Sequence, residues 1–390
     1  MNKKTFKTTA LLVLVCLGIN VVSFGQSAQP INVVTTAVPF LRISPDARAG
    51  GMGDIGIPTS PDANSGFYNL AKIPFAKKNT AVSLTYTPWL RDITKDVYMI
   101  SAAGYHKLSD EDAINIGVRY FNLGNIDFTT ADGNPNGQGR PREFGIDFGY
   151  ARKLSDKMGI GVALRYINSS LANGITASGV NYKAGTSFAG DISLYGDLTN
   201  EQGEGVTWGV AVSNLGSKIG YTDNALTKDY IPANLGAGIA YTWPVEETSK
   251  FTLAGEVNKL LVPAVPNITF PDNGDPISSE DSAKLADYRT QSIFSSWAKS
   301  FSNSAYGFSG GAEFNYNDQF FARAGYYFET KEAGNRKFFT AGVGLKYNVF
   351  GLNISYLAPS GSGVTRNPLS NTLRFSLYFD LDNIGGDSNQ

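Results

Sequence analysis

The stretch Leu373-Arg374-Phe375-Ser376-Leu377-Tyr378-Phe379-Asp380-Leu381, near the end of this 390-residue chain, decides the fold. Apolar residues occupy every second position, and Arg, Ser, Tyr and Asp stand between them. Successive side chains of a β-strand point to opposite faces, so this pattern predicts a strand with one apolar and one polar face. The apolar face carries no charge and includes aromatic rings, which is typical of a strand whose outer face meets lipid.

The same alternation recurs from residue 80 onward, in segments of about ten residues separated by breaks. An even number of strands is required for a single-chain bacterial outer-membrane barrel. The pattern predicts fourteen strands, at 80–89, 96–108, 112–122, 142–154, 158–169, 185–198, 205–214, 232–243, 250–258, 304–316, 319–329, 337–348, 350–358 and 371–381.

The connections between these strands alternate in length, which separates a barrel from a soluble β-sandwich. The short ones are 109–111, 155–157, 199–204, 244–249, 317–318 and 349, and the long ones include 123–141, 170–184, 215–231, 259–303 and 359–370. Short turns on one side and long loops on the other are the signature of an outer-membrane barrel. We therefore predict an all-β, antiparallel transmembrane barrel of about 14 strands over residues 80–382, followed by a tail at 383–390.

The N-terminus predicts export. Lys3, Lys4 and Lys7 precede an apolar stretch, and Ser23-Phe24-Gly25 provides a small-x-small cleavage pattern. We expect residues 1–25 to be a cleaved signal peptide, because the apolar stretch is too short to cross a bilayer as an anchor helix.

Cleavage would remove the only Cys, so disulfides, thiolate metal sites and cysteine nucleophiles are excluded from the mature protein. The single His of the chain rules out multi-histidine metal sites and histidine-based triads. Loss of three lysines leaves 30 basic against 34 acidic residues, which argues against nucleic acid as a partner. No nucleophile–base arrangement stands out, so the sequence predicts neither an enzyme nor a cofactor site.

Residues 26–79 do not alternate and are rich in Pro and Gly, which predicts irregular structure or short helices. Because this segment precedes the first strand, it can lie at the periplasmic side or fold into the lumen as a plug. Within it, Gly51-Met52-Gly53-Asp54-Ile55-Gly56 matches the dinucleotide fingerprint literally. No apolar strand precedes it and Pro58 follows, so close backbone packing is the better interpretation.

Charged residues recur on the predicted inner faces of the strands. They could line a polar pathway, but pairing across the barrel wall is the simpler interpretation. The residues are Arg119, Asp147, Arg165, Glu256, Glu313, Arg323, Lys346 and Arg374.

The longest connection, 259–303, combines an apolar group with clustered carboxylates. Such a group in an external loop indicates an interaction site, although it could instead fold over the barrel mouth. Asp272, Asp275, Glu280 and Asp281 could hold Ca²⁺, but turns rich in Asp and Asn are commoner, and we predict no metal site. The candidate partner-binding residues are Leu260, Leu261, Val262, Val265, Ile268 and Phe270.

Several motifs resemble a known family. They are Asp46-Ala47-Arg48-Ala49-Gly50-Gly51-Met52-Gly53, Asp62-Ala63-Asn64, Tyr68-Asn69-Leu70-Ala71, Asn258 to Pro263, and Tyr316 to Phe320 running into Arg323 to Tyr326. Together they are similar to the PorV (LptO) family, the outer-membrane barrels of type IX secretion, whose fold is similar to that of FadL-type fatty-acid transporters. The residues that carry the N-terminal motif are Asp46, Arg48, Gly50, Gly51, Met52, Gly53 and Asn69.

The resemblance implies a non-enzymatic role in the outer membrane. PorV-like barrels bind the C-terminal signal domain of secreted cargo after it leaves the SprA/Sov translocon, pass it to the PorU sortase, and cap a lateral opening of the translocon. The expected partners are therefore the translocon, the sortase, cargo signal domains and membrane lipid. The alternative is a FadL-like channel for uptake of hydrophobic small molecules, which would need an apolar lumen pocket leading to a gap in the wall.

Overall fold

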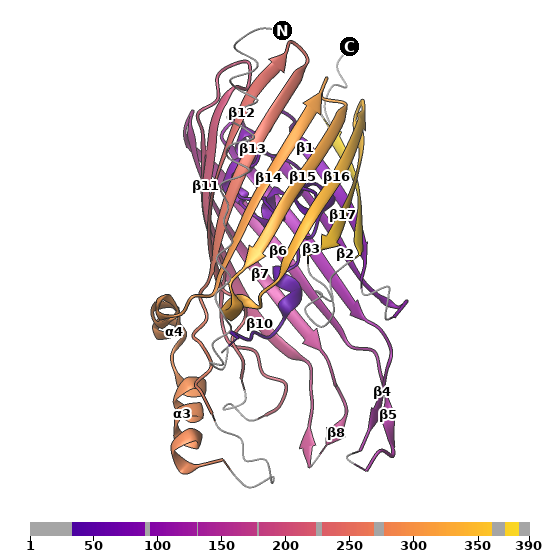
Figure 1. Ribbon diagram of the computed structural model, residues 1–390, viewed down its shortest axis with the longest axis vertical. Coiled ribbons are helices and arrows are strands. Elements are labelled where there is room, and N and C mark those ends of the chain that lie inside the picture. The colour runs from indigo at the N-terminus through magenta and orange to yellow at the C-terminus, as the bar shows by residue number, and fades with distance from the viewer. Residues whose placement is uncertain are drawn as a thin grey trace. The chain divides into compact units, whose positions relative to one another are not determined.

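The computed structural model describes residues 33–89, 94–130, 132–177, 179–223, 228–268, 277–360 and 371–381. The predicted signal peptide and C-terminal tail lie outside these residues. Within them, fourteen strands form one closed antiparallel barrel (Figure 1). The strands are β1 (Thr80–Pro88), β2 (Val97–Lys107), β3 (Asp112–Leu123), β6 (Arg142–Ser155), β7 (Met158–Ser170), β10 (Gly185–Asp197), β11 (Gly205–Gly216), β12 (Asn234–Glu246), β13 (Ser249–Leu260), β14 (Tyr306–Tyr316), β15 (Phe320–Glu329), β16 (Lys337–Tyr347), β17 (Phe350–Pro359) and β18 (Thr372–Leu381).

Each of the fourteen predicted strands corresponds to one barrel strand, with ends within three residues of those expected. Each barrel strand pairs with the next one along the chain, and β1 closes the ring by pairing with β18. Two further hairpins, which the sequence did not predict, extend from the long connections. They are β4 (Ile126–Thr129) with β5 (Pro135–Gly139), and β8 (Thr176–Ala177) with β9 (Val180–Asn181).

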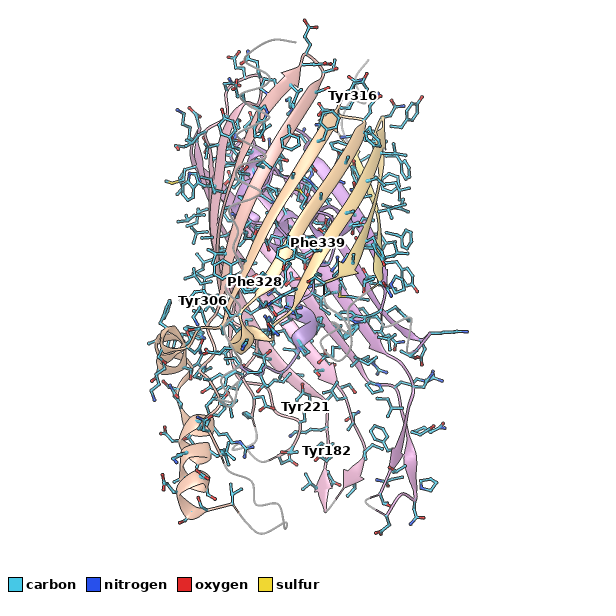
Figure 2. All side chains as sticks on the ribbon, viewed as in Figure 1. Tyr182, Tyr221, Tyr306, Tyr316, Phe328 and Phe339 are labelled. Carbon is cyan, nitrogen blue, oxygen red and sulfur yellow. The ribbon has the colours of Figure 1, made fainter. Side chains whose placement is uncertain are left out.

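The faces of the strands follow the predicted alternation. In β18, Arg374 and Ser376 point inward and are 3% and 1% exposed, whereas Phe375 and Leu377 point outward and are 38% and 39% exposed. Aromatic residues gather toward both rims of the outer surface. Figure 2 shows Tyr306 and Phe328 toward the end that carries the long loops and Tyr316 at the opposite end. This arrangement matches the aromatic girdles of outer-membrane barrels.

The long connections all lie at one end of the barrel and the short turns at the other (Figure 1). We assign the long-loop end to the extracellular side and the short-turn end to the periplasmic side.

The segment 33–79, which we call the plug, lies inside the barrel (Figure 1). It contains four short helices: η1 (Pro39–Arg42), α2 (Ala47–Gly50), η2 (Ser65–Phe67) and η3 (Leu70–Phe75). Of the two positions expected from the sequence, the lumen is therefore the one observed. Two apolar clusters join the plug to the wall, one around Phe40, Leu41 and Phe121 and the other around Leu70 and Ile73.

The connection between β13 and β14, which we call the β13–β14 loop, contains three helices at the extracellular end of the barrel (Figure 1). These are α3 (Ser279–Thr290), α4 (Ile293–Lys299) and η5 (Ser300–Ser302), and a further short helix, η6 (Lys331–Ala333), lies between β15 and β16. The side chains of Ser278 and Ser292 cap α3 and α4 by accepting a backbone N–H. No helix in the described part of the chain is long and apolar enough to cross a membrane.

Candidate functional site

Hydrogen bonds tie the plug to strands around the whole lumen. The backbone N–H of Ala47 donates to Ser376 Oγ on β18 (2.9 Å), and Thr207 Oγ1 on β11 donates to the Pro58 carbonyl (2.6 Å). Arg119 Nη1 on β3 donates to the Leu41 carbonyl (3.2 Å). Because the contacts reach strands far apart in the ring, the plug is fixed from several sides.

Arg48, in the N-terminal motif, is the centre of a largely buried group of four charges. Its guanidinium forms two hydrogen bonds to the Glu313 carboxylate on β14 (3.1 Å each) and one to Asp62 Oδ2 (2.9 Å). Arg323 Nε on β15 donates to the same Glu313 (2.6 Å), and its Nη1 donates to Asn353 Oδ1 (2.8 Å). Two cations face two anions, so the cluster is neutral as a whole, which offsets the cost of burying charge.

Asp46 organises the turn that presents Arg48. Its side chain caps α2 by accepting the backbone N–H groups of Arg48 (2.8 Å) and Ala49 (3.1 Å). The hydroxyl of Tyr68 donates to the other carboxylate oxygen (2.6 Å) and lies 2.7 Å from Ser44 Oγ. The Asp46 and Tyr68 motifs, which are separate in the sequence, therefore form one unit.

The glycines of the motif allow the plug backbone to touch the wall. Gly53 has φ +73°, and a Cβ atom there would lie 2.8 Å from the Tyr326 carbonyl oxygen. Its N–H donates to Thr340 Oγ1 at 2.8 Å. On the wall, a Cβ on Gly325 would lie 2.2 Å from the carbonyl carbon of Met52, so this contact also needs glycine. Gly51, Gly53 and Gly56 thus serve close packing, as the sequence indicated, rather than a nucleotide.

Asn69 and Glu256 hold the second half of the plug. Asn69 Nδ2 donates to the Leu194 carbonyl on β10 (2.9 Å), while its Oδ1 accepts the N–H of Ala71 (3.1 Å). Glu256 Oε2 on β13 accepts the backbone N–H groups of Gly56 (3.0 Å) and Ile57 (2.9 Å). All seven residues of the predicted N-terminal motif therefore lie in the plug, where they contact the wall or shape the turns that do so.

Lys72 is a buried cation of the plug that lies outside the motif. Its Nζ donates to the Gly56 carbonyl (2.7 Å) and Thr59 Oγ1 (3.0 Å). Burial lowers its pKa to about 8. Nothing in the sequence distinguished Lys72 from a surface lysine, because its burial depends on the folded plug.

The predicted inward charges are buried or half-buried in the wall, and several pair with one another. Arg165 forms ion pairs with Asp147 and with Asp191 (2.9 Å), and Lys346 pairs with Asp380. Others pair with the plug instead, as Glu313 does with Arg48 and Arg374 does with Asp54 (3.6 Å). The charges therefore fill and brace the interior instead of lining a continuous polar path.

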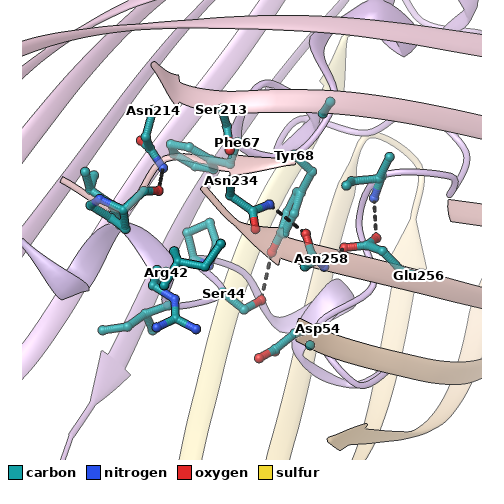
Figure 3. A pocket seen from close by; sticks show the side chains of 18 of the residues that line it. Arg42, Ser44, Asp54, Phe67, Tyr68, Ser213, Asn214, Asn234, Glu256 and Asn258 are labelled. Atoms are coloured by element: carbon teal, nitrogen blue, oxygen red, sulfur yellow. Dashed lines mark hydrogen bonds between the residues drawn. The ribbon is translucent and has the colours of Figure 1, made fainter. Parts of the chain in front are cut away.

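A cavity of about 130 Å³ remains between the plug and the wall of β11 to β13. Figure 3 shows polar side chains converging on it, with Tyr68 directed at Ser44 and with Asn234 hydrogen-bonded to Asn258 (2.8 Å). Its wall also includes Asp54 and Glu256. Ligand pockets are typically about 300–1,000 Å³ and mostly apolar, so this space suits a few water molecules better than a hydrophobic compound.

The candidate partner-binding residues divide into three groups. Leu260, Leu261 and Val262 are buried, and Leu260 and Val262 pack with Val34 and Tyr230 in a cluster at the barrel mouth. Val265 and Ile268 are half-buried, and Phe270 lies outside the described residues. The sequence allowed two interpretations, an exposed patch or a cover over the barrel mouth. Leu260, Leu261 and Val262 agree with the second of these. Whether this region binds a partner remains a prediction.

Exposed aromatic residues occur further along the same loop, on α4 and η5. Phe294 is 77% exposed and Phe301 is 59% exposed, and the ring of Trp297 packs edge-on against Phe294 with centroids 5.2 Å apart. Phe294 and Trp297 are three residues apart on α4 and so share one face of that helix, and Phe301 follows in η5. Sequence reasoning missed this surface, although the spacing and the cap at Ser292 were available to indicate it.

The carboxylates considered for Ca²⁺ are not brought together in the described part of the chain. Asp272 and Asp275 lie outside it, and Glu280 and Asp281 lie in the first turn of α3, where both pair with Lys284. Among the described residues no group of three or more His, Cys, Asp or Glu is placed to hold a metal ion.

Comparison with known proteins adds one family and a set of similar folds. The model of a family described as type IX secretion system protein PorV matches residues 26–267. A search of curated protein sequences finds no match. The CymD monoaromatic hydrocarbon channel is 12% identical, covering 91% of this chain and 100% of its own, with a TM-score of 0.52. The toluene transporter TbuX of Ralstonia pickettii is 12% identical, covering 86% and 97%, with a TM-score of 0.51. At such identity the likeness shows the fold alone, and it confirms the predicted FadL-like barrel.

Proposed function

This chain belongs to the PorV family and is an outer-membrane component of type IX secretion, and from that premise we propose its specific role. It binds the C-terminal signal domain of secreted cargo and carries it from an SprA/Sov-type translocon to a PorU-type sortase. It also caps the lateral opening of the translocon. These tasks are non-enzymatic, because they need recognition surfaces rather than reacting groups.

The observation that carries the proposal is the aromatic surface of Phe294, Trp297 and Phe301, at the extracellular end of the barrel. Exposed aromatic residues of this kind are enriched at the centres of protein interfaces. Lys299, in the last turn of α4, places a cation beside these rings. On this side of the membrane the barrel would meet both the sortase and the cargo that leaves the translocon.

The state of the lumen supports a binding role over the alternative of a hydrophobic-uptake channel. Such a channel needs an apolar path, but the plug is fixed to the wall through Arg48, Glu313 and Glu256, and the cavity beside it is small and polar. Opening a path would require breaking buried charge pairs, which costs about 3–5 kcal/mol for a single pair.

The test is capture of the translocon by a Phe294→Ser/Phe301→Ser double variant in native membranes. We expect the wild-type barrel to co-purify with a large translocon subunit and the variant to lose most of it, with cargo retained in the cell envelope. A Leu154→Ser/Val245→Ser variant is the control, because it removes two apolar residues that are also more than half exposed, but at the periplasmic end.

Two outcomes would contradict the proposal. Translocon recovery that the double variant leaves unchanged would exclude this surface as the docking site. Normal secretion by a strain without the barrel, together with lost uptake of a hydrophobic compound, would favour the channel instead.

A further inference from the structure

A second cavity, of about 480 Å³, lies at the extracellular mouth of the barrel, and we call it the mouth pocket. Its walls come from plug residues 35–39, the extracellular ends of β3 and β6, the connection between β11 and β12, and α3. Tyr221, one of its lining residues, is labelled in Figure 2 on the long-loop side. The volume is within the range of small-ligand sites and well above that of the lumen cavity.

Most of the lining is apolar or aromatic. Phe121 and Leu123 form part of the floor, and the rings of Tyr230 and Tyr288 meet edge-on with centroids 5.4 Å apart. The Tyr221 hydroxyl donates a hydrogen bond to Ser169 Oγ (3.0 Å), and burial raises its pKa to about 12. One face of the Tyr230 ring is already covered by Lys218, whose Nζ lies 4.1 Å from the ring centroid, so the other rings of the lining are the ones open to a ligand.

One buried carboxylate interrupts this apolar lining. Glu143 is 2% exposed and accepts a hydrogen bond from Ser169 Oγ (2.6 Å), which in turn accepts one from the Tyr221 hydroxyl (3.0 Å). In the described ranges no basic side chain forms an ion pair with Glu143. The other charged lining residues, Asp229 and Arg289, are opposite in sign and exposed at the rim. The floor thus carries one buried carboxyl group that, among the described residues, is paired with no cation.

Such a pocket selects for a particular chemistry. A carboxylate in apolar surroundings is costly to keep ionised unless a cation pairs with it. Aromatic faces attract cations as well as alkyl groups. A primary ammonium on an apolar stem satisfies both requirements, since the stem packs on the rings while the charge reaches the carboxylate.

We propose that the mouth pocket binds a lysine side chain of the cargo signal domain, with the ammonium group against Glu143 and the alkyl stem against the aromatic walls. The identity of the polypeptide rests on the proposed function, because cargo is the polypeptide expected at this mouth. The pocket is separate from the surface at Phe294 and Phe301, so capture of cargo and capture of the translocon can be disrupted independently.

The first test compares two probes on the purified barrel in detergent micelles, by isothermal titration or saturation-transfer NMR. Nα-acetyl-lysine amide carries the ammonium group, and Nα-acetyl-norleucine amide has a similar alkyl stem without the charge. We expect the lysine probe to bind at least about tenfold tighter. Equal binding of the two probes by the wild-type barrel overturns the proposal, whether or not any variant assembles.

The same comparison on Glu143→Gln assigns the effect to one residue. Gln keeps the shape of the side chain and an acceptor for Ser169 but removes the charge, so the lysine preference should disappear while norleucine binding is unchanged. Glu111→Gln, which removes an exposed carboxylate at the periplasmic end, should retain the preference. Preference retained by Glu143→Gln would overturn the assignment.

Cargo capture separates this inference from the proposed function. If wild type and Glu143→Gln capture a purified cargo signal domain equally well, the lysine inference fails and the proposed function stands. If wild type captures no cargo, the proposed function fails, and the two amides alone decide whether the pocket recognises an ammonium group. Reduced capture by Glu143→Gln alone supports both.

Discussion

The plug and the β13–β14 loop are of similar length, but they place their charged and apolar residues in opposite ways. In the plug, Arg48 is mostly buried, and its guanidinium is held by Glu313 of the wall and by Asp62 and Ser60 of the plug. In the loop, Lys284 pairs with Glu280 at 2.7 Å on an exposed helix, while the ring of Phe294 faces outward. Buried charge needs partners and therefore holds a structure in one arrangement, whereas exposed rings remain available to another molecule.

Arg48→Ala tests the plug side of this comparison and should have the largest effect. The substitution leaves Asp62 without its ion-pair partner and Glu313 with Arg323 alone, so we expect a loss of about 3–5 kcal/mol in unfolding free energy. Urea titration of the barrel in micelles, followed by gel heat-modifiability, measures it. Arg152→Ala is the control, because its exposed pair with Glu111 should contribute at most about 1 kcal/mol. Similar losses in both variants would show that the plug adds little stability.

Leu260→Ala tests how firmly the β13–β14 loop is anchored where it leaves the barrel wall. Leu260 is buried in the mouth cluster, so its truncation should cost about 2–5 kcal/mol. Leu198→Ala, at an exposed position of a periplasmic turn, should stay within about 0.5 kcal/mol. The same unfolding titration gives both values. A small loss at Leu260 would mean that the base of the loop is not anchored as described.

Gly53→Ala and Gly174→Ala separate backbone strain from contact. Both glycines have positive φ, at +73° and +83°, but Gly174 has open space around it, whereas a Cβ on Gly53 meets the Tyr326 carbonyl. We expect about 1 kcal/mol of destabilisation at Gly174 from conformation alone and about 2–3 kcal/mol at Gly53. Equal losses, measured by thermal unfolding in micelles, would remove close packing as the reason for glycine in the motif.

Phe294→Ser/Phe301→Ser should have the smallest effect on stability. Both side chains are mostly exposed, so the unfolding free energy should change by no more than about 0.5 kcal/mol. Circular dichroism during the same titration reports it. A loss of several kcal/mol would mean that the rings pack within the protein, and reduced translocon capture by this variant would then have a structural explanation.

The barrel could be predicted from the sequence because the pattern that specifies each strand lies within a few neighbouring residues. Residues two apart share a face, so the stripe of Leu373, Phe375 and Leu377 identifies both the strand and its lipid side without knowledge of its neighbours. The same rule placed Glu313 and Arg323 inward. It could not supply Arg48 or Asp62, the two members of the cluster from the plug, because they lie in a segment without periodicity and Arg48 is 265 residues from Glu313.

The loop was harder to predict for a different reason. The apolar run beginning at Leu260 was compatible with an exposed interaction patch or with a cover over the barrel mouth. In the structure β13 extends two residues further than expected, and the N–H of Leu261 donates to the Ala233 carbonyl at 2.7 Å. This extension keeps the apolar residues after Leu260 packed at the mouth of the barrel. Helix α3 was missed because it has few apolar residues among its charges and therefore shows no helical stripe.

The pairing of β1 with β18 has a consequence for the order of assembly. The ring closes only when residues near both ends of the chain meet, and contacts so distant in sequence form slowly. A nascent barrel that lacks β14 leaves Arg48 without Glu313 and the sheet with two unpaired edges, which invite association with other chains. The plug lies directly before β1, but its contacts reach Glu313 on β14 and Ser376 on β18. Although the plug precedes the barrel in the chain, it is therefore fixed in the lumen only after the last strands have been made.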